Sequence, residues 1–312
     1  MPPPPRGRVW IALASLYLIW GSTYIAIRFA IESLPPLFMA GTRFILAGGA
    51  MVAWRLLRGD RWPRPIHWRE AAIVGGLMLL GGNGGVCWAE QTVPSGLAAL
   101  LVSTVPLWIV LFEWALLRTL RPSPDLLAGV ALGISGVALL VRPGSGAGGV
   151  HAAVPWAGAV VLVVASMLWA LGSLYSRRAR LPSSPFLAIG MEMLAGGLIL
   201  MIAAALLGEW RALPSVRLSP RSLASLLYLV AFGAVVGFTA YIWLLRHTSP
   251  ALASTYAFVN PIVAMFIGWA IGGEALGART LLAAALAVSG VTVIILARAR
   301  MEGRRVPTSI PG

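Results

Sequence analysis

Ten long apolar segments recur along the 312-residue chain and leave little room for anything else. Each covers roughly 17–25 residues, the length that a helix needs to cross the hydrocarbon core of a bilayer. Backbone polar groups find no water in lipid, so segments of this kind have to be helical. We place them at residues 10–30, 36–57, 71–89, 97–117, 125–141, 156–175, 186–207, 223–245, 251–271 and 280–296. The sequence therefore predicts an all-α integral membrane protein with ten transmembrane helices.

Composition excludes a water-soluble domain and several kinds of chemistry. Only 11% of the residues are charged, against about 25% in a soluble domain, and 59% are hydrophobic. All 24 basic residues are Arg, so the chain has no Lys for a phosphate-binding loop or a Schiff base. The single cysteine, Cys87, excludes an intrachain disulfide and a cysteine-ligated metal cluster. We expect no cofactor, no metal site and no catalytic residue.

The net charge of +14 would by itself suggest a nucleic-acid partner. Most of the Arg residues, however, fall in the N-terminal arm, the even-numbered loops and the C-terminal tail. This is the distribution that the positive-inside rule gives when both termini are cytoplasmic. The outer side is left with five Arg residues, and three of them, Arg211, Arg217 and Arg221, lie in the loop after the seventh segment, which is the weak point of this assignment. The charge therefore predicts orientation, and no nucleic-acid partner is expected.

The two halves of the chain repeat each other. Gly21–Tyr24 (GSTY) returns as Gly172–Tyr175 (GSLY), and Pro36, Gly41 and Gly48 return in the same order as Pro185, Gly190 and Gly197. A repeat of five spans enters the membrane from the opposite side the second time, because five is odd. The sequence thus predicts two inverted-topology repeats, residues 1–149 and 150–312, the plan of many secondary transporters.

Several short motifs resemble those of the EamA-type branch of the drug/metabolite transporter superfamily, most closely its YedA-like members. They are IWGSTY at 19–24, ESLPP at 32–36, AGTRF at 40–44, AE at 89–90, VPSG at 93–96, IGMEML at 189–194, SPALAS at 249–254 and NP at 260–261. The resemblance implies a ten-helix inverted-repeat transporter of the cytoplasmic (inner) membrane, often an exporter of amino acids, metabolites or drugs. It does not fix the substrate. Glu113 departs from the family pattern, and no role is carried over to it.

Arg43 and Glu192 are the sharpest candidates for a substrate path. They lie at equivalent positions of the second and seventh segments, with opposite charge. A charge near the middle of the bilayer is costly and should face protein or water. One hypothesis is a direct or water-bridged pair that lines a cavity between the repeats and biases its gating. The alternative is a static ion pair that only holds the bundle together.

Aromatic residues form a second group of candidates. Trp20 and Trp169 lie inside spans, away from the interfacial belts where Trp gathers, and Tyr24 and Tyr175 follow them. An aromatic lining would suit amphipathic or aromatic substrates, and the alternative is ordinary helix packing.

Polar residues and prolines inside the later part of each repeat complete the set. Glu90, near Asn83, is a candidate for binding a substrate ammonium or a coupling proton, and its alternative is a solvated helix end. Asn260 precedes Pro261, which removes a backbone hydrogen bond and frees carbonyls toward a cavity. We interpret Pro106 and Pro261 as hinges, with an inert kink as the alternative.

The prediction is a small-molecule secondary transporter embedded in the lipid bilayer, not an enzyme, with proton coupling and oligomeric state left open. The alternatives are an integral membrane transferase or protease and a non-transporting scaffold. The sequence has no H-E-x-x-H, no G-x-S-x-G and no paired intramembrane aspartates, and ten spans with little mass outside them argue against a scaffold. Four G-x-x-x-G patterns, beginning at Gly81, Gly129, Gly233 and Gly268, predict close helix packing.

Overall fold

The computed structural model describes residues 5–116, 118, 123–141, 155–248, 252 and 255–305, and within them all regular secondary structure is helical. Eight helical stretches are long and apolar enough to cross a membrane, and residues Pro124–Leu139 and Tyr256–Ala270 form two shorter apolar helices. The predicted all-α membrane class is therefore confirmed. The boundary proposed between the two repeats, after residue 149, lies outside the described residues.

The first half contains α1 (Arg6–Ala30), α2 (Pro36–Leu57), α3 (Pro65–Gly75), the π-helix η1 (Gly76–Gly84), α4 (Gly85–Ala89), α5 (Ser95–Val102), α6 (Val105–Ala115) and α7 (Pro124–Val141). The second contains α8 (Trp156–Ser176), α9 (Pro185–Leu206), α10 (Glu209–Ala212), the 3₁₀ turn η2 (Leu213–Ser215), α11 (Pro220–Tyr228), the π-helix η3 (Leu229–Val236), α12 (Gly237–His247), α14 (Tyr256–Ala270) and α15 (Ala278–Arg305).

Three predicted spans are not regular α-helices. The third, α3–η1–α4, and the eighth, α11–η3–α12, each contain a π-helical segment at the corresponding place. The fourth is interrupted at Ser103–Thr104, just before Pro106, and continues as α6. Pro261 instead lies inside α14, which continues past it. The π segments were not predicted, because an apolar run has the same composition in either kind of helix.

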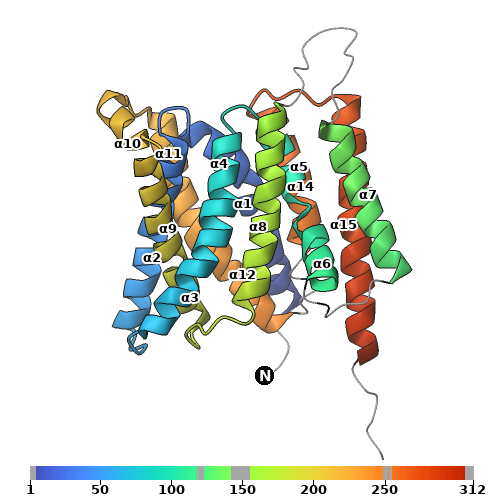
Figure 1. Cartoon of the computed structure of the whole chain (residues 1–312), viewed down its shortest axis with the longest axis horizontal. Helices are drawn as coiled ribbons and strands as arrows, with labels where there is room; N and C mark the ends of the chain where they lie inside the picture. The colour runs from blue at the N-terminus through green and yellow to red at the C-terminus, as the bar shows by residue number, and fades with distance from the viewer. Residues whose placement is uncertain are drawn as a thin grey trace, which may run out of the picture.

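Helices at corresponding positions of the two halves pack against each other, α2 on α9 and α7 on α15. These two pairs form opposite edges of the bundle (Figure 1). Between them, α1 packs on α11, η3 and α12, while α8 packs on α3, η1 and α4. Phe44, Leu162 and Leu229 belong to one buried apolar cluster, so elements of both halves share a single core.

Glycines let α2 and α9 cross closely. A Cβ on Gly48 would lie 2.7 Å from the Gly190 carbonyl oxygen, and one on Gly41 would lie 3.2 Å from that of Gly197. Small residues at a crossing allow two helix backbones to approach without side chains between them. The predicted pattern at Gly81 and Gly85 also packs closely, against Leu168 and Ala165 of α8.

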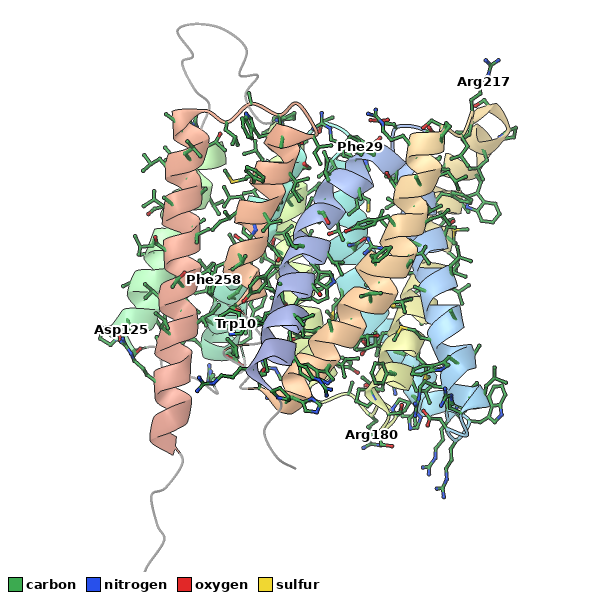
Figure 2. All side chains as sticks on the ribbon, turned by 180° about the vertical axis from the view of Figure 1, so that it is seen from behind. Trp10, Phe29, Asp125, Arg180, Arg217 and Phe258 are labelled. Carbon is green, nitrogen blue, oxygen red and sulfur yellow. The ribbon has the colours of Figure 1, made fainter. Side chains whose placement is uncertain are left out.

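The bundle has two ends, which we name by residues labelled in Figure 2. Arg180 and Asp125 lie at one end, the Arg180 end, where α1 also begins. Arg217 lies at the opposite end, the Arg217 end, close to which Phe29 stands in the last turn of α1. Arg180 lies in an even-numbered loop, which the sequence assigns to the cytoplasmic side, and Arg217 lies in a loop that it assigns to the outer side. These two residues are thus found at opposite ends of the bundle.

Candidate functional site: the bundle interior

Arg43 projects from α2 into the interior and is only 4% exposed. Its Nε and Nη1 atoms make no hydrogen bond. The guanidinium carbon lies 4.8 Å from the centroid of the Phe44 ring, and a Cβ on Gly233 of η3 would lie 3.2 Å from Nη2. No ion pair joins Arg43 to an acidic residue of the described part of the chain, and a buried cation without a counter-charge is costly.

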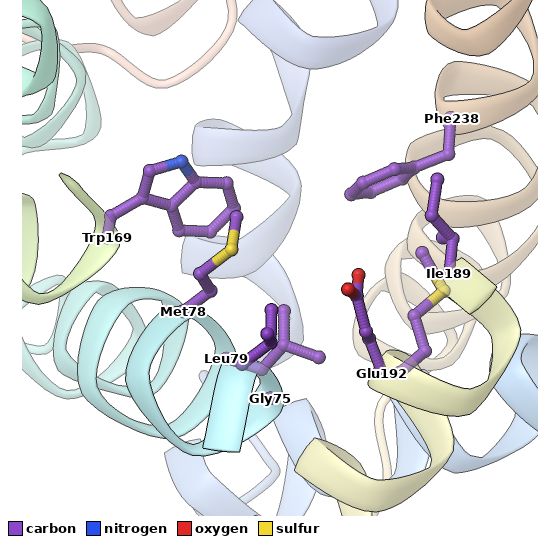
Figure 3. Close-up of a pocket in the computed structure, with 9 residues that line it drawn as sticks. Gly75, Met78, Leu79, Trp169, Ile189, Glu192 and Phe238 are labelled. Atoms are coloured by element: carbon purple, nitrogen blue, oxygen red, sulfur yellow. The ribbon is translucent and has the colours of Figure 1, made fainter. Parts of the chain in front are cut away.

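Glu192 projects from α9 into a pocket where elements of both halves meet. The pocket is lined by Val74, Gly75, Met78, Leu79, Trp169, Ile189, Glu192, Met193 and Phe238. Figure 3 shows the carboxylate pointing into the space between Trp169 and Met78 on one side and Phe238 on the other. The cavity volume is about 20 Å³, enough for one water molecule. In this conformation the pocket is too small for any larger molecule.

Arg43 and Glu192 do not form an ion pair with each other among the described residues. The reason lies in the packing. Arg43 Nη2 lies against Gly233 of η3 in the eighth span, whereas Glu192 lines a pocket with Val74 and Gly75 of α3 in the third. Neither the direct pair of the gating hypothesis nor the static ion pair considered from the sequence is therefore formed among the described residues.

Trp20 and Trp169 occupy corresponding places, each against a π-helical segment. The Trp20 indole Nε1 donates to the Gly233 carbonyl oxygen of η3 at 3.1 Å. A Cβ on Gly82 of η1 would lie 2.8 Å from the Trp169 ring. Trp20 also packs against Phe238, with ring centroids 5.2 Å apart. Phe238 therefore contacts Trp20 and also lines the Glu192 pocket, which Trp169 lines too.

The remaining aromatic and amide candidates lie outside the Glu192 pocket. The Tyr175 hydroxyl donates to Glu70 Oε2 at 2.7 Å, at the end of α8. Tyr24 is half-buried and packs against the large apolar core. Asn83 Oδ1 accepts a long hydrogen bond of 3.6 Å from the Cys87 thiol. The predicted set is therefore distributed over several contacts rather than gathered in one cavity.

Glu90 is buried, at 2% exposure, so the alternative of a solvated helix end is wrong. Both of its carboxylate oxygens lack a hydrogen-bond partner, as does Oδ1 of the buried Asn260. In the described part of the chain, the buried side-chain nitrogen and oxygen atoms without a partner belong to Thr42, Arg43, Glu90 and Asn260. Three of these four residues are candidates named from the sequence.

Two glutamates that the sequence analysis did not select join the halves at the Arg217 end. Glu274, which follows α14, accepts from Ser95 N at 2.7 Å, Ser95 Oγ at 2.8 Å and Gly96 N at 3.0 Å. It also pairs with Arg28 at 3.0 Å. Glu209 accepts from Phe38 N at 2.8 Å. Each carboxylate thus caps the first turn of a helix in the other half.

A signal for these caps was present in the sequence. The residues before α2 and α5 are Pro35 and Pro94, and neither helix has an N-cap side chain of its own. A helix start without a local acceptor needs one from elsewhere. Glu113, to which no role was given, is accounted for by an ion pair with Arg177 at 3.2 Å.

Comparison with known proteins agrees with this architecture. The chain is 42% identical over 291 residues to "Uncharacterized inner membrane transporter YedA" of Escherichia coli K12, covering 92% of this chain and 90% of the relative. It is 24% identical over 288 residues to "Uncharacterized transporter YoaV" of Bacillus subtilis, covering 91% and 95%. A crystal structure with a TM-score of 0.63 at 24% identity covers 96% of this chain and 100% of its own, which shows a shared fold.

The match to a protein family is direct and occurs twice along the sequence. Residues 6–142 and residues 156–296 each match the EamA-like transporter family. Together with the apolar helices, this makes the protein a multi-pass membrane protein, and the chain belongs to the EamA-like transporter family.

Proposed function

We propose that the protein is a secondary transporter that exports a small molecule, such as a metabolite, an amino acid or a drug. In this proposal two inverted five-helix repeats, residues 1–149 and 150–312, alternate access to a site between them. The location is the cytoplasmic membrane, with both termini cytoplasmic. The name of the Escherichia coli relative supports a location in the inner membrane. The distribution of Arg residues supports the cytoplasmic placement of both termini. The relatives' names also support a transporter rather than an enzyme.

The duplicated family match supports the two repeats. Reciprocal contacts add to this support, because α1 packs on the span containing η3 just as α8 packs on the span containing η1. A twofold relation between the halves requires such an exchange, and inverted repeats in transporters commonly have it.

The observation that carries the proposal is the group of unpartnered polar side chains inside an apolar bundle. Arg43, Glu90 and Asn260 are buried, and their side chains hold polar atoms without a hydrogen bond. Glu192 adds a carboxylate that faces a pocket. A scaffold gains nothing from such groups, since each costs free energy in the absence of a ligand. A transporter uses them to bind its substrate, its coupling ion or both.

The remaining candidates take supporting roles in this mechanism. Trp20, Tyr24, Trp169 and Tyr175 line or border the path, with Asn83 beside Cys87. Pro106, after the interruption between α5 and α6, and Pro261, inside α14, act as hinges. The Glu274 and Glu209 caps hold the Arg217 end closed, so substrate reaches the site from the Arg180 end once the helices around the pocket separate.

The test is export by cells that overproduce the chain. We expect at least one metabolite to accumulate in the medium of cells with the wild-type protein and not of cells with Arg43→Gln. Gly49→Ala is the matched control, since a Cβ on Gly49 meets nothing within 4 Å. Equal medium profiles for wild-type and empty-vector cells across amino acids, other metabolites and drugs would refute the proposal. Transport into inside-out vesicles, with and without a pH gradient, tests proton coupling.

A further inference from the structure

The Glu192 pocket combines one carboxylate with surfaces that prefer an organic cation. The indole of Trp169 and the ring of Phe238 stand on opposite sides of the carboxylate, and Met78 lies on the same side as Trp169 (Figure 3). The remaining side chains of the lining, Val74, Leu79, Ile189 and Met193, carry no charge and no hydrogen-bonding group apart from thioether sulfur.

The carboxylate has no counter-charge of its own. Among the described residues, none forms an ion pair or a hydrogen bond with the Glu192 side chain, and Arg43, its counterpart in α2, faces η3 instead. A negative charge that is enclosed by apolar side chains attracts a cation strongly, because little water screens the interaction. An anionic ligand would be repelled by the same charge.

The chemistry of the lining favours an organic cation over a metal ion. Calcium and magnesium bind to six or more oxygen atoms, and the side chains of this pocket supply only the two of Glu192. Aromatic faces within about 6 Å stabilise an ammonium group by cation–π attraction, and thioether sulfur adapts to apolar substituents of varied shape. The lining therefore matches an ammonium group that carries apolar or aromatic substituents.

We propose that this pocket is the substrate site and that the substrate is an organic cation, an amine or a quaternary ammonium with an apolar body. The inference rests on the proposed transport function and names the substrate class of that site. Glu192 binds the positive nitrogen, Trp169 and Phe238 contact its substituents, and the apolar body extends along Val74 and Ile189.

Binding in this pocket requires the helices around it to separate. The cavity of about 20 Å³ holds a single water molecule and no amine of this size. Its walls come from α3 and η1 of the first half and from α8, α9 and α12 of the second. Ligand entry therefore moves the halves apart, which couples binding to the conformational change of the transporter.

The experiment measures binding of radiolabelled benzyltrimethylammonium to the full chain in lipid nanodiscs. We expect saturable binding by the wild type that unlabelled benzyltrimethylammonium displaces and neopentylbenzene, its uncharged isostere, does not. Glu192→Gln keeps the shape and removes the charge, and should weaken binding at least tenfold, or about 1.4 kcal/mol. Trp169→Leu should weaken it several-fold. Asp125→Asn, which changes an exposed carboxylate, and Trp210→Leu, which changes an exposed indole, are the matched controls.

Lack of saturable binding to the wild type, equal affinity of Glu192→Gln, or equal displacement by neopentylbenzene would each overturn the inference. Export measurements separate this failure from failure of the proposed function. If cells export a neutral or anionic metabolite and Glu192→Gln does not change the rate, the protein is a transporter with a different substrate class. If the cation binds through Glu192 but is not moved across the bilayer, the site stands and the transport proposal fails.

Discussion

The contact at Glu274 makes a quantitative prediction about conformational equilibrium. Its carboxylate receives hydrogen bonds from Ser95 N, Ser95 Oγ and Gly96 N, at 2.7, 2.8 and 3.0 Å, and its side chain is 7% exposed. The contact joins the loop after α14 to the start of α5, so it holds the two halves together at the Arg217 end. Weakening it should increase the population in which that end is open.

Glu274→Gln removes the charge and one of the two acceptor oxygens while keeping the shape. Hydrogen bonds to a charged group contribute about 1.5–3 kcal/mol each, against about 0.5–1.5 kcal/mol for neutral ones. Arg28 adds little, because its side chain is 39% exposed and solvent screens the ion pair. We take a net loss of ~2 kcal/mol for the variant, which raises the open population ~30-fold.

Cys87 is a natural reporter for this opening. It is the only cysteine of the chain, it is fully buried in α4, and it lies one turn before the buried Glu90. The assay is the rate at which a water-soluble maleimide modifies Cys87 in protein held in lipid nanodiscs. When reclosing is faster than modification, the rate follows the open population, so we expect an increase of ~10–30-fold.

The control is Glu32→Gln, at the same end of the bundle. Glu32 pairs with Arg221, whose side chain is 60% exposed, and an exposed pair contributes little. Its modification rate should stay near that of the wild type. A rate for Glu274→Gln within twofold of wild type, or an equal rise for Glu32→Gln, would refute the reasoning, as would a rise that only parallels a loss of melting temperature.

Three further predictions concern single contacts. Gly48→Ala places a Cβ 2.5 Å from Leu194 N and should lower stability by ~1–3 kcal/mol in thermal unfolding. At the neighbouring Gly49 a Cβ meets nothing within 4 Å, so Gly49→Ala should leave the melting temperature unchanged. Equal melting temperatures for the two variants would contradict the close crossing of α2 and α9. Trp20→Phe leaves the Gly233 carbonyl without its 3.1 Å donor and should cost ~1 kcal/mol, with Trp10→Phe, exposed on α1, as the unchanged control. Hydrogen bonds from Arg55 and Ser184 lower the pKa of Asp60 below its ordinary value. The stabilising contribution of Asp60 is therefore full above its unfolded-state pKa and is lost as pH falls through its folded-state pKa. Asp60→Asn should make the melting temperature fall less steeply with decreasing pH on the acid side. An unchanged slope would contradict this.

Much of the candidate site followed from the sequence, because a buried charge in an apolar span is unusual wherever it occurs. Arg43, Glu90, Glu192 and Asn260 were selected on that ground, and all four lie in the bundle interior. Their partners could not be predicted in the same way. Spacing places Arg43 and Glu192 at equivalent positions of equivalent helices, but whether they meet depends on which neighbouring helix each one faces.

The sequence by itself determined the class of the protein: apolar run length demands helices that can cross a membrane, and the repeated motifs indicate two related halves. Only the tertiary structure decided how those helices meet. It turned Arg43 toward η3 and Glu192 toward α3, formed π segments within two spans, and brought Glu209 and Glu274 to helix starts far away in the chain. The physical reason is that composition determines whether a segment is stable in lipid or in water. Helix rotation and crossing instead depend on contacts between residues that are distant in the sequence.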